Sequence, residues 1–221
     1  GEGAGAVVLK RLDTALDNQD RIYASIDAVA LVHTSSAPSA KAVNRASCQA
    51  LDLAGITSEK IGYLEVSGSG IEQEDRAEVD GLTQTYGSHT RNCALGSIKS
   101  NIGHTFAASG MASLIKTALC LHHRYLPGVP GWSPPKSSWQ ESPFYVPGES
   151  RPWFTSLAAP ERTAAINVMS IDGASAHIIL TETPERIHPV STRSLRPPFH
   201  LFPITGQTRK DLLDRLDRLK Q

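Results

Sequence analysis

His104 and Lys99 are the residues of this chain whose types and spacing best suit chemistry. Both lie in SIKSNIGHT, between a segment that predicts a strand and a long apolar segment that predicts a helix. In α/β proteins such strand-to-helix turns point backbone N–H groups outward and receive ligands. A histidine there can act as an acid or a base, and a lysine five residues earlier can reach the same crevice. The structural alternative is a capping histidine beside a surface lysine.

Ser67 is a second candidate, because it stands at a sharp turn in YLEVSGSG, residues 63–70. Apolar residues predict a strand that runs into alternating small residues, which would lift this hydroxyl off the end of a sheet. The pattern is a poor match to the nucleophile turn G-x-S-x-G, since the leading glycine is missing. The acidic residues between Glu72 and Asp80 fit a solvated helix N-terminus better than a cation site.

The remaining histidines favour structural roles. His177 lies in the apolar segment ASAHIIL, where a hydrogen-bonded core histidine is the commoner arrangement. His122 and His123 fall in the predicted last turn of a helix, where an imidazolium suits the helix dipole. The histidines and cysteines lack the spacing of zinc ligands, so the sequence predicts no metal site.

The elements that must position these residues alternate between strand and helix patterns. A short helix or turn is predicted at 13–19, longer helices at 39–54, 74–87 and 106–126, and strands at 6–12, 21–34, 61–66, 93–100, 162–170 and 176–182. The long helix carries an apolar stripe of Met111, Leu114, Ile115, Ala118 and Leu119. This alternation predicts a layered α/β fold.

Charge and composition exclude several classes of function. Lys+Arg and Asp+Glu both number 22, so no overall field indicates nucleic acid or an anionic membrane as a partner. No apolar run approaches the roughly 20 residues of a membrane-spanning helix. Residues 1–184 carry 14 basic and 18 acidic side chains, whereas residues 185–221 carry 8 and 4, which predicts a boundary between them.

The cysteines and the first residues indicate the setting of the chain. Three widely spaced cysteines without a CxxC motif indicate a reduced, cytoplasmic protein. GEGAGAVVLKRL has no signal-peptide features and begins directly with a strand pattern. We therefore expect the chain to be a piece of a longer polypeptide.

Several motifs follow one another in a set order: GEGAGAVVLKRL, YLEVSGSG with Asp75 and Glu78, LGSIKSNIGHTFAASGMASLIK, a proline-rich loop ending in SRPW, and ASAHIILTE. In this order they resemble the β-ketoacyl synthase domain of polyketide and polyunsaturated-fatty-acid synthases, in its ketosynthase or chain-length-factor form. The resemblance covers residues 1–182 and concerns the C-terminal part of such a domain. Residues 185–221, with LFPIT and a short leucine-bearing helix, resemble the linker that leads to the next domain.

The resemblance implies a thiolase-like fold with αβαβα layers, of which this chain holds mainly the C-terminal half. The nucleophilic cysteine of the family belongs to the first half, which is nearly absent from the chain. In active members the turn reads EAHGTGT, and its histidine binds the malonyl carbonyl during decarboxylation. Here Ser67 takes the place of that histidine, Ser69 stands in the same turn as a substrate-binding position, and Ile71 replaces a threonine that helps hold pantetheine.

The other site residues follow from the same resemblance. His104 matches the second family histidine, with Lys99 beside it. The family gate GFGGTNAH reads SIDGASAH at residues 170–177. Ile171 therefore replaces the gating phenylalanine, and Asp172 replaces a glycine where a backbone amide normally helps form the oxyanion hole.

These substitutions oppose the family reaction, because each pre-placed donor for a developing anion is worth roughly 3–4 kcal/mol. The sequence predicts a chain-length-factor-like domain that shapes the acyl tunnel of a condensing partner. One alternative is an active synthase in which Ser67 and a water replace the histidine, and another is a docking scaffold without activity. The resemblance implies no bound cofactor and acyl groups carried on the phosphopantetheine of an acyl carrier protein. It also implies the N-terminal half of the domain, and a ketosynthase partner or a second copy, as further partners.

Overall fold

The computed structural model describes residues 1–34, 37–87, 93–129, 131–133, 142–155, 160–183 and 208–218. The chain divides into two compact units, Gly1–Pro184 and Glu185–Gln221. In the second unit the predicted helix is present as α6, Arg209–Arg218, with Arg215 paired to Asp211 at 3.0 Å. The rest of that unit lies outside the described residues, as do the side chain of Leu216 and all of Leu219.

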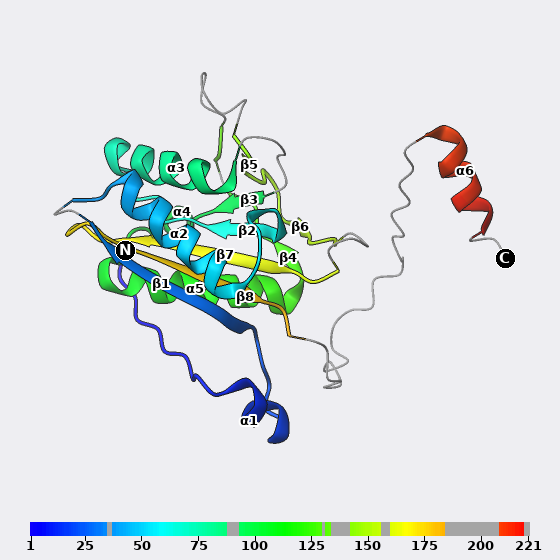
Figure 1. The fold of residues 1–221 in the computed structure, drawn as a ribbon, viewed down its shortest axis with the longest axis horizontal. Helices are drawn as coiled ribbons and strands as arrows, with labels where there is room; N and C mark the ends of the chain where they lie inside the picture. Colours follow the sequence, from blue (N-terminus) through cyan, green and yellow to red (C-terminus); the bar gives the residue numbers. More distant parts are fainter. Residues whose placement is uncertain are drawn as a thin grey trace. The chain divides into compact units, whose positions relative to one another are not determined.

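A six-stranded mixed sheet organises the first unit (Figure 1), in the order β1-β8-β7-β2-β3-β5. β1, β8 and β7 pair antiparallel, and β7, β2, β3 and β5 pair parallel. The strands are β1 Ser25–His33, β2 Ile61–Glu65, β3 Cys93–Gly96, β5 Phe144–Tyr145, β7 Thr163–Met169 and β8 Ala174–Thr181, beside a small sheet of β4 Tyr125–Leu126 and β6 Arg151–Pro152. The antiparallel β7–β8 hairpin therefore joins the edge strand β1 on one side to the parallel strands β2, β3 and β5 on the other.

Helices cover the two faces of this sheet and make it a layered α/β unit. On one face lie α2, Ala40–Ala54, and α3, Glu72–Tyr86, and on the other lies α5, Ser109–His123 (Figure 1). Alternation along β2 divides the core accordingly, because Leu64 packs with the α2–α3 cluster and Tyr63 packs with the α5 cluster. The short helices are α1 Leu12–Asp17, α4 Lys99–Ile102, η1 Ser58–Lys60 and η2 Phe106–Ala108.

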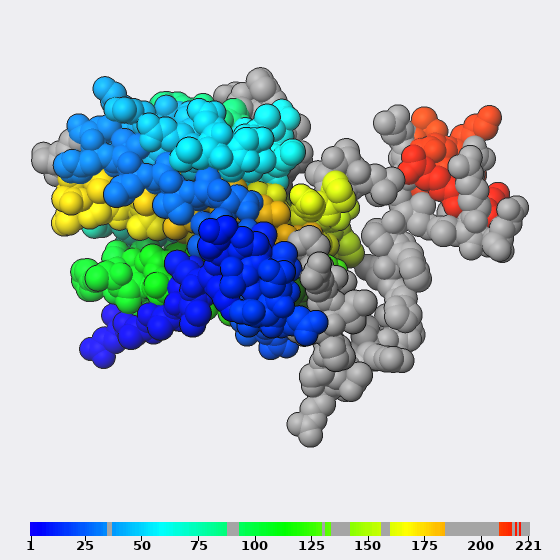
Figure 2. Space-filling model, turned by 60° about the horizontal axis from the view of Figure 1, so that its bottom comes forward, coloured from blue at the N-terminus to red at the C-terminus, as the bar shows by residue number. Residues whose placement is uncertain are grey.

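The strand predicted at 6–12 is wrong. Residues 1–11 form no regular structure, and within this segment the side chain of Val8 is 95% exposed. A strand needs a neighbour for its backbone hydrogen bonds, and none of the described strands pairs with this segment. It runs instead along α5, where a Cβ added at Gly5 would lie 2.7 Å from Met111 (Figure 2).

Only part of the apolar stripe of α5 faces the sheet. The most buried residues of the helix are Ser109, Ser113, Thr117, Cys120 and Leu121, and Leu114 of the stripe packs partly buried against the core cluster of the sheet. Ile115 and Leu119 instead line a cavity of about 610 Å³ together with the N-terminal segment. Small residues let this helix lie close to the sheet and leave a second, apolar face available to pack.

None of the helices in the described ranges combines the length and the hydropathy of a membrane span.

Candidate active site

The turn after β2 holds Ser67 by its backbone. The N–H of Ser67 and the N–H of Gly68 donate to the two carboxylate oxygens of Glu78, at 2.7 and 2.9 Å. Gly68 has a φ of +49°, which a residue with a side chain rarely adopts, so the sharp turn needs a glycine here. Ser67 is buried as a result, and its position is set by a carboxylate eleven residues away.

The second half of the turn uses another carboxylate from α3. Asp75 accepts from the Gly70 N–H at 3.1 Å and from the Ser69 hydroxyl at 3.3 Å. The Ser69 oxygen in turn accepts the N–H of Ile71 at 3.2 Å. The predicted substrate-binding hydroxyl of Ser69 therefore already takes part in two hydrogen bonds of the turn.

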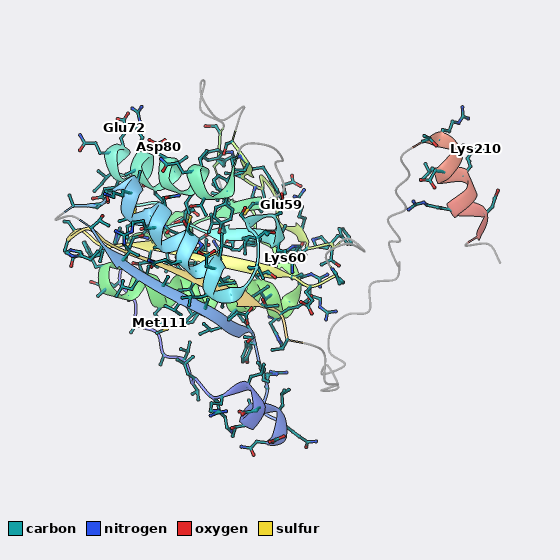
Figure 3. The ribbon with its side chains drawn as sticks, in the orientation of Figure 1. Glu59, Lys60, Glu72, Asp80, Met111 and Lys210 are labelled. Atoms are coloured by element: carbon teal, nitrogen blue, oxygen red, sulfur yellow. The ribbon has the colours of Figure 1, made fainter. Side chains whose placement is uncertain are left out.

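The acidic segment of α3 is only partly the solvated helix start that the sequence predicts. Glu72 and Asp80 lie on the outer side of the helix, away from the sheet (Figure 3). Asp75 and Glu78 instead satisfy backbone donors of the preceding turn, and Glu78 is fully buried. The prediction was wrong for these two residues because helical periodicity turns them inward, toward the turn. Within the described ranges, the acidic residues form no group with histidine or cysteine that could hold a metal ion.

A chain of hydrogen bonds through two buried residues, Asn167 and His177, and the half-buried Tyr86 ends at Glu78. The Asn167 side-chain amide donates to Glu78 at 2.6 Å, the Asn167 Oδ1 lies 3.3 Å from His177 Nδ1, and the Tyr86 hydroxyl lies 3.0 Å from His177 Nε2. Burial lowers the pKa of His177 to about 3 and raises the pKa of Glu78. His177 is thus a neutral, hydrogen-bonded core residue, as its apolar surroundings in the sequence indicate.

Lys99 contacts the Ser67 turn directly. Its ammonium group donates to the backbone carbonyl of Ser67, and the Ser97 hydroxyl donates to the same oxygen at 3.3 Å. Burial lowers the pKa of Lys99, while the negative charges of Glu78 and Glu65 oppose that shift. The structure therefore brings Lys99 and Ser67 into one place, at the carboxyl end of neighbouring strands β2 and β3.

His104 lies in the turn between α4 and α5. Its Nδ1 accepts the N–H of Phe106 at 2.9 Å, as in the capping alternative. The acceptor role of Nδ1 places the ring proton on Nε2 of the neutral imidazole, where it can be donated to another group. No hydrogen bond joins His104 to Lys99 or Ser67 within the part of the chain that the structure describes.

The turn that matches the family gate joins β7 to β8. Ile171 is 83% exposed at its tip, and Asp172 Oδ1 accepts the N–H of Ala174 at 3.1 Å. That hydrogen bond is the main cause that lowers the pKa of Asp172, so the carboxylate is ionised at neutral pH. The Asp172 carbonyl also accepts from His33 Nε2 at 2.8 Å. Sequence reasoning missed His33, whose only signal is its place at the end of the strand that pairs with β8.

Sequence reasoning also missed Glu65 and Lys116, which form a buried ion pair at 2.8 Å. The signal was present, because YLEV places one acid in an apolar strand and SLIKTAL places one lysine in an apolar helix. A charge in such a position is buried only when it is paired.

The fold is a layered α/β unit in which Lys99 meets the Ser67 turn at the carboxyl ends of the parallel strands β2 and β3. Residues 23–132 match the family described as "Beta-ketoacyl synthase, C-terminal domain". The chain belongs to the β-ketoacyl synthase family, and it corresponds to the C-terminal part of a polyketide synthase ketosynthase domain. Its fold is therefore thiolase-like, and it contains mainly the C-terminal half of that fold.

The relatives and solved structures agree with this assignment. Polyketide synthase PksL of Bacillus subtilis is 35% identical over 100% of this chain, and polyketide synthase ThaG of Burkholderia thailandensis is 34% identical over 83% of it. The chain covers 5% and 4% of those two proteins. The ketosynthase from module 6 of the bacillaene synthase of Bacillus subtilis matches with a TM-score of 0.74 and 33% identity, over 79% of this chain and 33% of that structure. The Streptomyces albus oxazolomycin ketosynthase domain OzmH KS7 matches with a TM-score of 0.73 and 31% identity, over 81% of this chain and 34% of that structure.

Proposed function

We propose that this chain is part of a ketosynthase-like domain that does not itself carry out decarboxylative condensation. It acts like a chain-length factor and shapes the tunnel for the acyl chain of a condensing partner. The observation that carries the proposal is Ser67, which stands where active family members have the malonyl-binding histidine. The carboxylate of Glu78 and the ammonium of Lys99 both bind the backbone of Ser67, so the position is fixed and only the donor has changed.

A fixed serine is a poor replacement for that histidine. Its hydroxyl reaches less far than an imidazole, and it cannot carry positive charge when an enolate-like anion develops. A lost donor of this kind costs roughly 3–4 kcal/mol of transition-state stabilisation. Asp172 adds an ionised carboxylate to the gate turn, at a position that is glycine in active members.

The partners of the proposed domain follow from the same role. Acyl groups arrive on the phosphopantetheine of an acyl carrier protein, and a ketosynthase partner or a second copy supplies the condensing site. The N-terminal half of the domain packs against the apolar face of α5. The exposed side chain of Leu119 and the half-buried side chain of Ile115, which line one apolar cavity, support that last point.

A second candidate function is condensation by this domain itself, with Ser67 and a water in the role of the histidine. The specific observation in its favour is His104, whose Nε2–H remains available while Nδ1 accepts from Phe106. Lys99 also keeps its contact with the turn. A docking scaffold without acyl binding is the third candidate.

Release of carbon dioxide from malonyl-acyl carrier protein separates these candidates. The complete natural polypeptide is compared with its Ser67→His/Asp172→Gly variant and with a Ser58→His control in the short helix η1. We expect the wild type to release carbon dioxide about 10²–10³-fold more slowly than an ordinary ketosynthase. The double variant should recover this rate, and the Ser58→His control should release carbon dioxide as slowly as the wild type. Either single change alone should restore little, because residues that act as a unit are not additive.

Each result selects one candidate. Wild-type release at the rate of an ordinary ketosynthase would refute the proposal and establish the condensing alternative. Slow wild-type release without any rescue would favour the docking scaffold.

A further inference from the structure

Glu65 is the most completely enclosed charge at the end of β2. Its side chain is 0% exposed, and its carboxylate accepts three hydrogen bonds. The donors are the Ile98 backbone N–H at 2.6 Å, the Tyr63 hydroxyl at 2.5 Å and the Lys116 ammonium at 2.8 Å. Both oxygens thus accept hydrogen bonds, one from the backbone and the other from the two side chains.

These donors belong to the elements that carry the candidate site. Glu65 precedes Ser67 by two residues, and Ile98 immediately precedes Lys99. Lys116 lies in α5, the helix that follows the His104 turn. One carboxylate therefore joins the strand of Ser67, the turn of Lys99 and the helix after His104.

The surrounding backbone leaves room for this arrangement. A Cβ at Gly96 would overlap the Tyr63 hydroxyl and would lie 3.2 Å from the Lys116 ammonium. The ammonium also lies 5.8 Å from the centre of the Tyr63 ring. The absence of a side chain on β3 at this point is what allows the tyrosine and the lysine to reach Glu65 together.

We propose that Glu65 is a positioning residue of the site, which fixes the Lys99 turn and α5 against the strand that ends in Ser67. It acts through the Ile98 N–H and the Lys116 ammonium, and not by contact with a substrate. The role holds whether or not the domain condenses, so it does not depend on the proposed function. The charge of Glu65 has a second effect, since it is one of the charges that keep the Lys99 ammonium protonated against burial.

The test removes the carboxylate without leaving an unpaired buried charge. Two double variants of the complete natural polypeptide serve, Glu65→Leu/Lys116→Met and Glu65→Gln/Lys116→Met. The matched control is Glu59→Gln, the same chemical change at an exposed glutamate just before β2 (Figure 3). Amide hydrogen exchange is measured at Ile98 and in α2, and the pH dependence of Lys99 acylation by acetic anhydride is followed by peptide mass spectrometry.

The Leu/Met variant loses the acceptor of the Ile98 N–H, so we expect exchange there about ten- to a hundredfold faster, with α2 unchanged. The Gln/Met variant keeps a side-chain oxygen for Ile98, so its exchange should change little. Both variants should shift Lys99 acylation toward lower pH, and the control should not. Two results would overturn the proposal, because either would mean that Glu65 contributes only to general stability. One is amide exchange that becomes faster by the same factor in α2 and at Ile98. The other is a pH dependence of Lys99 acylation that does not shift in the Gln/Met variant.

Discussion

Acid should destabilise this unit through His177, which lies beneath the Ser67 turn. The Asn167 Oδ1 can only accept, so the ring proton is on His177 Nδ1 and Nε2 accepts the Tyr86 hydroxyl. A second proton on Nε2 would oppose the Tyr86 donor and would place a charge at a fully buried position. Burial accordingly lowers the pKa of His177 from 6.5 to about 3.

The size of the effect follows from that shift. Below pH 6.5 the unfolded chain binds a proton at this histidine, whereas the folded chain does not do so until about pH 3. The free energy of unfolding is therefore unaffected by His177 above pH 6.5 and falls as the pH drops below it. Each pH unit in that window costs about 1.4 kcal/mol, which gives a loss of about 2 kcal/mol at pH 5.

The measurement is the free energy of unfolding of the β7–β8 hairpin in the complete natural polypeptide. Amide protection of this hairpin is followed against urea concentration at pH 7 and pH 5. The variant His177→Gln keeps one donor and one acceptor but does not titrate, so its loss between the two pH values should be smaller by about 2 kcal/mol. His123→Gln, at an exposed histidine in the last turn of α5, should behave as the wild type. A full pH dependence in His177→Gln would refute the reasoning.

Two further predictions concern packing. Gly96→Ala should lower the free energy of unfolding by about 1–3 kcal/mol, and with it the melting temperature, because the new methyl group overlaps the buried Tyr63 hydroxyl. The control is Gly148→Ala, whose Cβ meets nothing within 4 Å and which should leave the melting temperature unchanged. The 221-residue chain on its own should bind an apolar dye and melt without cooperativity, because Leu119 of α5 is exposed and lines an open apolar cavity with Ile115. A soluble monomer with a sharp thermal transition would contradict this.

Local chemistry made the boundaries of α2 predictable from the sequence. The pattern at 39–54 places α2 correctly because Ser39 accepts the Ala42 N–H at 3.3 Å at one end and Gly55 adopts a φ of +65° at the other. The segment 6–12 shows the limit of the same approach. A run of small and β-branched apolar residues indicates that a segment is to be covered, but it does not specify which strand will pair with it.

Sequence reasoning reached the candidate site only in part. It expected Lys99 to share a crevice with His104, whereas in the structure the Lys99 ammonium donates to the backbone carbonyl of Ser67. The support of the turn was not predictable, because Glu65 meets Lys116 across 51 residues and Glu78 meets Asn167 across 89. Such pairs depend on the order of strands in the sheet, which no local pattern specifies.

The buried charges of Glu78, Glu65 and Lys116 cost free energy of folding, and this cost bears on their role. Burial disfavours the charged form of Glu78, as its raised pKa indicates, and Glu65 and Lys116 also bury charge. Apolar residues of similar volume at such positions are often neutral or stabilising, so stability alone does not call for these charges. What they provide is a fixed turn at Ser67 with Lys99 against it. The proposed chain-length-factor-like role requires a turn of fixed shape at this point, whereas the alternative of a scaffold that only docks does not.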